Sequence, residues 1–578
     1  MEKHGSLSIS SENIFPIIKK WMYSDHDIFV RELVSNGCDA ITKLKKLDMM
    51  GEYSIPEGNR FKIQVIVNPE EKTLKFIDNG LGMTADEVEE YINQIAFSGA
   101  TDFLSKYKDK TNEDQIIGHF GLGFYSAFMV ADEVHIDTLS YKADAQPVHW
   151  ECDGGTEYSM AEGSRTEVGT EITLFLNEDA LEFANEYRVR EILEKYCSFM
   201  PTEIYLSKAN AEVQYETIAT DDLRDTDTIV ETIHTDAEME EKENEDGTKE
   251  LVEVSPAKDE YKIIKRPVPI NDTTPLWGKH PNECTEEEYK DFYRTVFRDY
   301  KEPLFWIHLN MDYPFNLKGI LYFPKINTEY DSIEGTIKLY NNQVFIADNI
   351  KEVIPEFLML LKGVIDCPDL PLNVSRSALQ NDGFVKKIAD YITKKVADKL
   401  SGMCKTEKEA YEKYWDDIAP FIKFGCLKDD KFCERMNDYI LFKDLDGKYL
   451  TLPEALKVNE DAAKTEDADD NSAESSAETE TTAQSADAET TDDSSKKRTV
   501  FYVTDEVQQG QYIKMFKEQG LTAFILTHNI DQPFISQLEQ KNENIRFQRI
   551  DADLTDEFKE DIDTDAMKGD IDSLTETF

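Results

Sequence analysis

The chain carries a glycine-rich stretch, Gly118-His119-Phe120-Gly121-Leu122-Gly123-Phe124, on which the assignment of its fold depends. Glycines lack Cβ, so they adopt positive φ angles and let backbone N–H groups approach an anion closely. An apolar run follows at once and predicts a helix whose N-terminus lies at the loop. No Gly-Lys-Ser/Thr of a Walker loop follows, and no strand leads directly into the stretch. A phosphate-binding loop and a plain flexible loop are both open at this point.

A second informative segment is a predicted helix over residues 26–47, whose apolar residues form one broad arc at 100° per residue. Glu32, Asn36 and Asp39 are spaced at i, i+4 and i+7, so they share a stripe at the edge of that arc. Partial desolvation there suits the Glu32 carboxylate to accept a proton from water. The Asn36 amide oxygen is a ligand type that Mg²⁺ accepts beside phosphates. A polar helix border with ordinary caps is the alternative.

The third segment is Asp78-Asn79-Gly80-Leu81-Gly82-Met83. Alternating apolar residues at 63–67 and 74–76, separated by Asn68-Pro69-Glu70, predict a hairpin with Asp78 at its end. A carboxylate in that position can accept a hydrogen bond from an exocyclic amine, and the two glycines would allow a planar base to approach. A plain Asp-Asn-Gly turn is the alternative.

The order of these three clusters resembles the ATP site of the gyrase, heat-shock, histidine-kinase and mismatch-repair superfamily. Further motifs narrow the resemblance to the bacterial ninety-kilodalton heat-shock chaperone family. It covers most of positions 8–455 and, more weakly, 499–556. The motifs are Arg31-Glu32-Leu33-Val34-Ser35-Asn36, Asp78-Asn79-Gly80-Leu81-Gly82-Met83-Thr84, Ile95-Ala96-Phe97-Ser98-Gly99, Gly118-His119-Phe120-Gly121-Leu122-Gly123-Phe124-Tyr125-Ser126, Asp272-Thr273-Thr274-Pro275-Leu276-Trp277, Pro303-Leu304-Phe305-Trp306-Ile307 and Pro371-Leu372-Asn373-Val374-Ser375-Arg376.

The resemblance implies a role for each residue of the site. Glu32 is expected to be the general base that polarises the attacking water, and Asn36 to ligate a Mg²⁺ ion that bridges the phosphates. Asp78 is expected to accept a hydrogen bond from the adenine amino group. Arg376 is expected to reach the terminal phosphate from a later domain, supported by Gln380 one helical turn on. The other residues expected to bind the nucleotide are Asp39, Gly82, Met83, Gly118, Gly121, Gly123, Phe124 and Thr170.

The same resemblance implies a lid over residues 94–123, with hinges near Gly99 and Gly118. His119 and Phe97 stand where many members of the family have Gln and Lys. Neither residue supplies the expected base or metal ligand, so the differences predict altered nucleotide affinity and lid kinetics rather than lost chemistry.

The expected fold is a multidomain α/β protein, with an N-terminal α/β sandwich ATPase domain followed by an α/β middle domain. The predicted boundaries are 1–218 for the ATP-binding domain, 219–260 for an acidic linker, 261–456 for the middle domain, 457–498 for a second acidic linker, 499–556 for a small βαβ unit and 557–578 for a short C-terminal segment. Both linkers are predicted to be disordered because they contain too few large apolar residues to offset the entropy of ordering. Nothing after position 556 resembles the helical dimerisation domain of this family, so the homodimer expected from the family is in doubt.

Composition narrows the function. The 578 residues include 117 acidic and 64 basic side chains, a net charge of −53, which argues against nucleic acid as a partner. Eight scattered cysteines without Cys-x-x-Cys spacing predict free thiols. No apolar run is long enough to span a membrane, and no signal peptide is evident, so the prediction is a cytoplasmic protein.

The sequence therefore predicts an ATP hydrolase that couples lid closure and domain docking to the folding or remodelling of client proteins, with ATP and Mg²⁺ as cofactors. One alternative is a nucleotide-gated binding module with little turnover. Another is a DNA-processing ATPase. Turnover of ATP separates the first two, and salt-dependent DNA binding would support the third.

Overall fold

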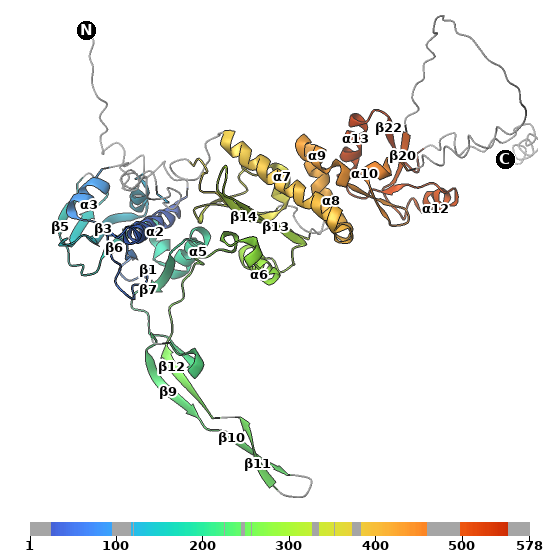
Figure 1. The fold of residues 1–578 in the computed structure, drawn as a ribbon. Helices are drawn as coiled ribbons and strands as arrows, with labels where there is room; N and C mark the ends of the chain where they lie inside the picture. Colours follow the sequence, from blue (N-terminus) through green and yellow to red (C-terminus); the bar gives the residue numbers. More distant parts are fainter. Residues whose placement is uncertain are drawn as a thin grey trace, which may run out of the picture.

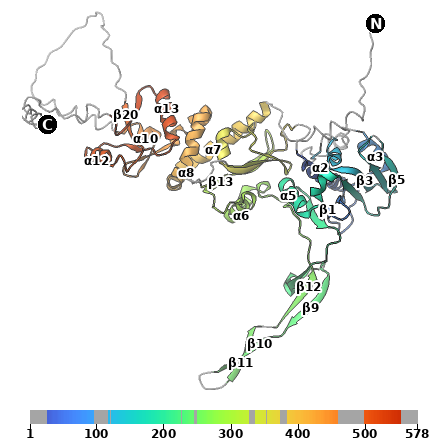
Figure 2. The same cartoon turned by 180° about the vertical axis from the view of Figure 1, so that it is seen from behind.

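The computed structural model describes residues 25–94, 117–118, 121–155, 157–224, 226–243, 249–255, 257–325, 335–351, 353–372, 383–458 and 498–552. Three folded parts follow one another along the molecule, and a long β-hairpin projects from the first of them (Figures 1 and 2). No helix in these ranges is long and apolar enough to cross a membrane. All eight cysteines are free thiols, as predicted.

The N-terminal domain is built on a seven-stranded sheet of order β5-β4-β3-β6-β2-β1-β7, in which β1 and β7 are parallel and the other neighbours antiparallel. The predicted hairpin is confirmed as β1 and β2, with its alternating apolar residues buried. The strands are β1 Lys62–Asn68, β2 Thr73–Asp78, β3 Ala131–Leu139, β4 Val148–Cys152, β5 Ser159–Glu162, β6 Gly169–Leu176 and β7 Glu203–Lys208.

Helix α2 packs against this sheet and begins and ends two residues later than predicted, at Ile28–Met49. Its Phe29 ring meets Phe76 of β2 edge-on at 6.3 Å and Phe183 at 5.0 Å, which fixes the helix on the sheet. The other helices of the domain are α3 Ala85–Tyr91, the 3₁₀ helices η3 Gly123–Met129 and η4 Glu178–Ala184, and α5 Glu186–Tyr196.

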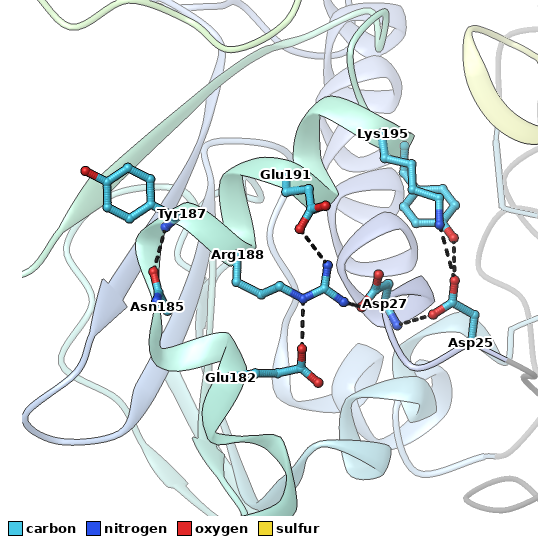
Figure 3. A network of polar contacts seen from close by, with 9 residues as sticks. Asp25, Asp27, Glu182, Asn185, Tyr187, Arg188, Glu191 and Lys195 are labelled. Carbon is cyan, nitrogen blue, oxygen red and sulfur yellow. Dashed lines mark hydrogen bonds and ion pairs between the residues drawn. The ribbon is translucent and has the colours of Figure 1, made fainter.

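A network of ion pairs holds the start of α2 (Figure 3). Arg188 of α5 donates to Asp27 at 2.6 Å, to Glu182 at 2.8 Å and to Glu191 at 3.0 Å. Asp27 occupies the N-cap position but makes no capping hydrogen bond, because its carboxylate is turned toward Arg188. The network therefore fixes the helix that carries the predicted base by tertiary contact rather than by a local cap.

The first acidic segment is folded where the structure describes it, so the prediction that the linker over residues 219–260 is disordered is wrong. It forms a three-stranded sheet of order β8-β12-β9, and β10 and β11 extend it as a two-stranded hairpin. Pairing between strands far apart in sequence satisfies the backbone N–H and C=O groups of this segment. Amino-acid composition does not reveal such pairing. The elements are β8 Tyr215–Ala219, η5 Thr220–Asp222, β9 Ile229–Thr235, β10 Glu238–Glu243, β11 Lys249–Ser255 and β12 Lys258–Ile264.

The middle domain has a five-stranded sheet of order β13-β14-β17-β15-β16. Residues 337–348 form two of its strands, β15 and β16, which pair antiparallel through a turn at Asn342 and Gln343. Both turn residues have positive φ, 53° and 64°, and this reverses the chain. The elements are η6 Leu276–Gly278, η7 Pro281–Glu283, α6 Glu286–Phe297, β13 Phe305–Met311, β14 Leu317–Phe323, β15 Ile337–Asn341, β16 Val344–Asp348, η8 Glu356–Leu360, β17 Lys362–Asp366, α7 Gly383–Thr406 and α8 Lys408–Lys428.

Aromatic side chains join the N-terminal and middle domains. Trp277 meets Phe199 at 4.6 Å and Tyr340 at 5.1 Å between ring centroids, and its indole N–H donates to Asp366 at 3.2 Å. Burial raises the pKa of Asp366 to about 6, although that hydrogen bond lowers it. The contact is apolar at its centre with one polar anchor, which gives the two domains a fixed junction.

The C-terminal unit contains the predicted βαβ arrangement, with parallel β20 and β21 and with Gly520 at φ +70° after the intervening helix. Its sheet has the order β19-β18-β21-β20-β22, so a domain boundary near residue 456 separates strands that the structure pairs. The second acidic segment, between them in sequence, lies outside the described residues. The elements are α9 Asp430–Met436, η9 Asn437–Tyr439, β18 Leu441–Asp444, β19 Tyr449–Thr451, α10 Leu452–Ala455, β20 Arg498–Val503, α12 Gly510–Glu518, β21 Phe524–Ile525, α13 Asp531–Lys541 and β22 Ile545–Arg549.

Candidate functional site

The glycine stretch lies directly on the polar stripe of α2. A Cβ added to Gly118 would be 3.1 Å from an oxygen of Asp39 and 3.8 Å from the amide oxygen of Asn36. A Cβ added to Gly123 would be 2.6 Å from Oε2 of Glu32. The structure thus brings together two clusters that are about eighty residues apart, and the glycines provide the room for the three polar side chains.

Asp39 holds the start of the glycine stretch. Its two carboxylate oxygens accept the backbone N–H groups of Ile117 and Gly118, each at 2.7 Å. Asp39 is only 5% exposed. Asp39 therefore positions the backbone at Gly118, and its predicted contact with the nucleotide stays a prediction.

Glu32 is 8% exposed and is paired with Arg31, which is 1% exposed. The guanidinium donates to Oε1 of Glu32 from Nε at 3.1 Å and from Nη2 at 2.7 Å. The Arg31 guanidinium also lies 5.7 Å from the centroid of the Tyr196 ring. Both of these hydrogen bonds end on Oε1, and Oε2 is the oxygen turned toward Gly123.

Asn36 lies between these two carboxylates along the helix and is half-buried. Within the described part of the chain, its side-chain amide has no hydrogen-bond partner. An unpaired amide oxygen beside a glycine loop suits a hard cation such as Mg²⁺, which takes one or two protein ligands and fills its other positions with phosphate oxygens and water. The residues present therefore fit the metal ion that the resemblance implies.

The predicted helix after the glycine stretch is present, but as the seven-residue 3₁₀ helix η3. Gly121 has φ +63°, which turns the chain into it. Phe124 is buried and meets Trp150 of β4 edge-on at 5.9 Å between centroids. The apolar run therefore anchors the loop to the sheet, while Gly123 faces Glu32 on the polar stripe of α2.

Asp78 ends β2 as predicted and is half-buried. Burial raises the pKa of its carboxyl to about 7, against the hydrogen bond from the Gly80 N–H at 2.8 Å and the nearby charge of Arg165, which lower it. The Cβ of Asp78 lies 3.3 Å from the position that a Cβ on Gly37 of α2 would take. The carboxyl group is therefore held against the same helix that carries Glu32.

The structure shows why residues 80 and 82, after Asp78, are glycines, and the reason differs from the one expected. A Cβ on Gly80 would lie 2.6 Å from the backbone of Ala40 in α2, and a Cβ on Gly82 would lie 1.9 Å from the carbonyl oxygen of Leu139. Gly82 also has φ +60°. Protein backbone, not an open space for a planar base, fills these positions, so the glycines let the loop pack between α2 and β3.

Thr138 of β3 is a site residue that sequence reasoning missed. Its hydroxyl accepts the backbone N–H of Met83 at 2.9 Å, donates to the carbonyl oxygen of Gly169 at 3.2 Å and lies 3.0 Å from the hydroxyl of Thr170. Thr170 is buried and pairs directly with Asp78 across β2 and β6. Only the place of a threonine on the inward, otherwise apolar face of β3, after Val134 and Ile136, could have signalled this position.

Several predicted residues lie outside the described ranges, namely Arg376, Gln380, His119, Phe97, Gly99 and most of the lid. Their roles stay predictions. Arg31, Thr138 and Arg165 are the residues that the geometry adds to the site.

We expect Asp78 to make the stability of the nucleotide-free protein depend on pH. In the unfolded chain its carboxyl titrates near 3.9, whereas in the folded protein its pKa is about 7. Between these values the folded state holds the extra proton, so the stability contributed by Asp78 falls as pH rises from about 4 to about 7 and levels off above. The variant Asp78→Asn does not lose this stability as pH rises. Its free energy of unfolding, relative to that of the wild type, should therefore be higher at pH 8 than at pH 5 by on the order of 1–3 kcal/mol.

Calorimetry at the two pH values checks this, read on the unfolding transition that ADP shifts in the wild-type protein. Asp86→Asn, on the exposed surface of α3, is the control and should show no such trend. Equal differences between variant and wild type at both pH values would contradict a half-buried, partly protonated Asp78.

Two protein families match parts of the chain. Residues 23–156 match the family described as histidine kinase-, DNA gyrase B- and HSP90-like ATPase, which defines the N-terminal domain as an ATPase domain of this class. Residues 182–457 match the Hsp90 protein family.

The chain is also similar along almost its whole length to bacterial proteins named chaperone protein HtpG. It is 41% identical to that of Bacteroides fragilis (strain YCH46) over 98% of this chain and 72% of the relative. It is 39% identical to that of Porphyromonas gingivalis (strain ATCC BAA-308 / W83) over 96% of this chain and 70% of the relative. It is 32% identical to that of Desulfitobacterium hafniense (strain Y51) over 72% of this chain and 59% of the relative. The chain belongs to the Hsp90 family and resembles its bacterial HtpG members.

Proposed function

We propose that the protein is a molecular chaperone that binds and hydrolyses ATP and uses the energy to act on client proteins. The observation that carries the proposal is the contact of Gly118 and Gly123 with Asp39, Asn36 and Glu32 on one face of α2. Asp78 packs against the same helix. The carboxyl group proposed to bind adenine, the loop proposed to bind phosphate and the carboxylate proposed as general base therefore lie around one helix.

The residues divide the work as follows. Asp78 accepts a hydrogen bond from the adenine amino group, and the bond from the Gly80 N–H to Oδ1 holds its carboxyl group in place. Backbone N–H groups of the glycine stretch hold phosphate oxygens. Asn36 would hold Mg²⁺, which when bound neutralises phosphate charge.

Glu32 orients the attacking water through Oε2 and accepts its proton. Arg31 supports this role because its two hydrogen bonds to Oε1 fix the carboxylate in place from a buried position. A base held in one orientation avoids reorganisation in the transition state. Asp39 keeps the loop against the helix, so that the phosphates and the water meet at Glu32.

The experiment for this function measures client binding and ATP turnover on the full chain. A permanently unfolded, fluorescently labelled protein should bind with an affinity that differs between a non-hydrolysable ATP analogue and ADP, and light scattering should detect compaction with the analogue. Asp78→Asn should remove the dependence on nucleotide. Normal nucleotide binding with the same client affinity in both states would contradict the proposal, and client gating without turnover would support the binding-module alternative.

Arg376 completes the proposed site from the middle domain, as the family resemblance implies. A guanidinium at the terminal phosphate acts after the domains dock, where it neutralises developing charge. Arg376→Ala should bind ADP with wild-type affinity but hydrolyse ATP more slowly and discriminate less between ATP and ADP. Arg435→Ala, at an exposed position of α9, is the matched control. Wild-type turnover in Arg376→Ala would confine the chemistry to the N-terminal domain.

A homodimer and a cytoplasmic location stay predictions.

A further inference from the structure

The outer face of the N-terminal sheet carries a cluster of two histidines and three carboxylates on β3 and β4. Val134 and Ile136 of β3 and Trp150 of β4 point into the core. The residues between them therefore project from the opposite face, because side chains alternate along a strand. Those residues are Glu133, His135 and Asp137 on β3 and His149 and Glu151 on β4.

Strand register brings these side chains together. His135 pairs directly with Glu151, and Asp137 pairs directly with His149. Glu151 Oε2 lies 3.5 Å from Nε2 of His149 and 3.8 Å from Nε2 of His135. One ligand atom from each of His135, His149 and Glu151 lies within 4.8 Å of the others. In a tetrahedral zinc site with bonds of about 2.0–2.1 Å, ligand atoms are roughly 3.3 Å apart, so small side-chain rotations bring the three into place.

The surroundings also suit a metal centre. Asp137 is hydrogen-bonded to Nδ1 of His149 at 2.8 Å, which leaves Nε2 of that ring toward Glu151. A carboxylate behind a histidine in this way orients the ring and raises its basicity as a ligand. The His135 ring packs on Phe175 at 4.7 Å between centroids, and this contact limits its rotation.

Glu133 offers a fourth ligand. Its carboxylate is 2.9 Å from Nε2 of His135, so a metal ion can replace the proton that these two atoms share. Glu171, on the neighbouring strand β6, lies directly opposite Asp137 and forms an ion pair with Lys75 at 2.7 Å. That lysine is thereby engaged by Glu171, and the cluster of Glu133, Asp137 and Glu151 keeps an excess of negative charge.

We propose that His135, His149 and Glu151 form a binding site for a divalent first-row transition metal such as Zn²⁺, with Glu133 as a further ligand and Asp137 as the positioning residue of His149. Imidazole together with carboxylate selects Zn²⁺ and its neighbours over Mg²⁺ and Ca²⁺, which prefer oxygen ligands alone. In the described part of the chain this is the one group of three His, Cys, Asp or Glu side chains with such spacing.

The site is distinct from the nucleotide site. Thr138 follows Asp137 in β3 but is buried on the opposite face, where it binds Met83 and Thr170. The sheet therefore separates the two sites. In both views β3 lies at the end of the N-terminal domain away from α7 and α8 (Figures 1 and 2), so the middle domain does not cover it there.

Equilibrium dialysis of the chelator-treated full chain against Zn²⁺ tests the proposal. We expect one Zn²⁺ per chain, unaffected by millimolar Mg²⁺, and visible absorption bands of tetrahedral Co²⁺ when that ion is used as the probe. His135→Ala and His149→Ala should each lose the bound ion. Asp137→Asn should keep it with roughly 10–100-fold weaker affinity, since it removes only the support of His149.

His234→Ala is the matched control, because His234 also contacts two carboxylates, Asp236 at 3.3 Å and Asp259 at 2.5 Å, but belongs to no such group. It should bind Zn²⁺ as the wild type does. Protection of His135 and His149 from carbethoxylation by Zn²⁺, mapped by mass spectrometry on the wild-type chain, does not depend on the folding of any variant. No protection, or unchanged Zn²⁺ binding in the His135 and His149 variants, would overturn the proposal and leave the cluster as an ion-pair network.

Discussion

Asp78→Asn is expected to abolish ATP and ADP binding to the full chain while leaving the protein folded. Asparagine is nearly isosteric with aspartate, but its amide can present a donor to the adenine amino group and weakens the acceptor. The mismatch leaves a shielded polar group unpaired and should cost on the order of 1–3 kcal/mol or more in binding free energy. Calorimetric titration measures the loss directly.

The structure provides an internal check on this variant. Because Asp78 holds a raised pKa of about 7 in the folded state, the neutral amide should be tolerated or even stabilising at pH 8. A variant that no longer binds nucleotide yet melts at or above the wild-type temperature has lost a contact, not its fold. Wild-type affinity in Asp78→Asn would refute the assignment of the adenine-binding carboxyl, whatever the melting temperature.

Glu32→Ala is expected to keep ATP binding and to lower turnover by roughly 10²–10⁴-fold, the usual contribution of a general base. The substitution also leaves Arg31 without its carboxylate at a position that is 1% exposed, so some loss of stability is expected. Glu32→Gln avoids this cost. Its amide oxygen still accepts from Arg31 but cannot take a proton from water.

Comparison of the two variants with the exposed control Glu89→Ala separates chemistry from structure. Single-turnover hydrolysis and nucleotide titration are measured side by side. Equal losses of turnover in Glu32→Gln and Glu32→Ala, with binding retained, identify Glu32 as the base. A parallel fall of binding and turnover in Glu32→Gln would instead make Glu32 a binding or structural residue.

The parts of the site that could be predicted depend on local pattern. The stripe of Glu32, Asn36 and Asp39 follows from helical spacing, and the position of Asp78 follows from the alternation of the hairpin before it. In each case the backbone period alone places the side chain on a known face. The glycines of the loop were also recognisable, although Gly80 and Gly82 turned out to accommodate protein backbone.

Other contacts of the site depend on the tertiary structure. Thr138 of β3 binds Met83, which follows β2, although β6 lies between these two strands in the sheet. Arg31 is the sequence neighbour of Glu32, but the burial of both side chains depends on how α2 packs in the domain. Asp39 accepts the backbone N–H of Ile117, seventy-eight residues later. The contacts of Thr138 and Asp39 have no signature within one helix or strand.

The sequence by itself determined the order of the nucleotide-site elements, the hairpin that ends in Asp78 and the polar stripe of α2, because period and glycine placement are local properties of the chain. Only the tertiary structure decided that the acidic segment from β8 to β12 folds as paired strands, and that β18 and β19 join the sheet of β20 to β22. It also placed two histidines and their carboxylates on one outer face. Strand pairing satisfies backbone hydrogen bonds across long sequence separations, so its outcome depends on partners that no local window contains.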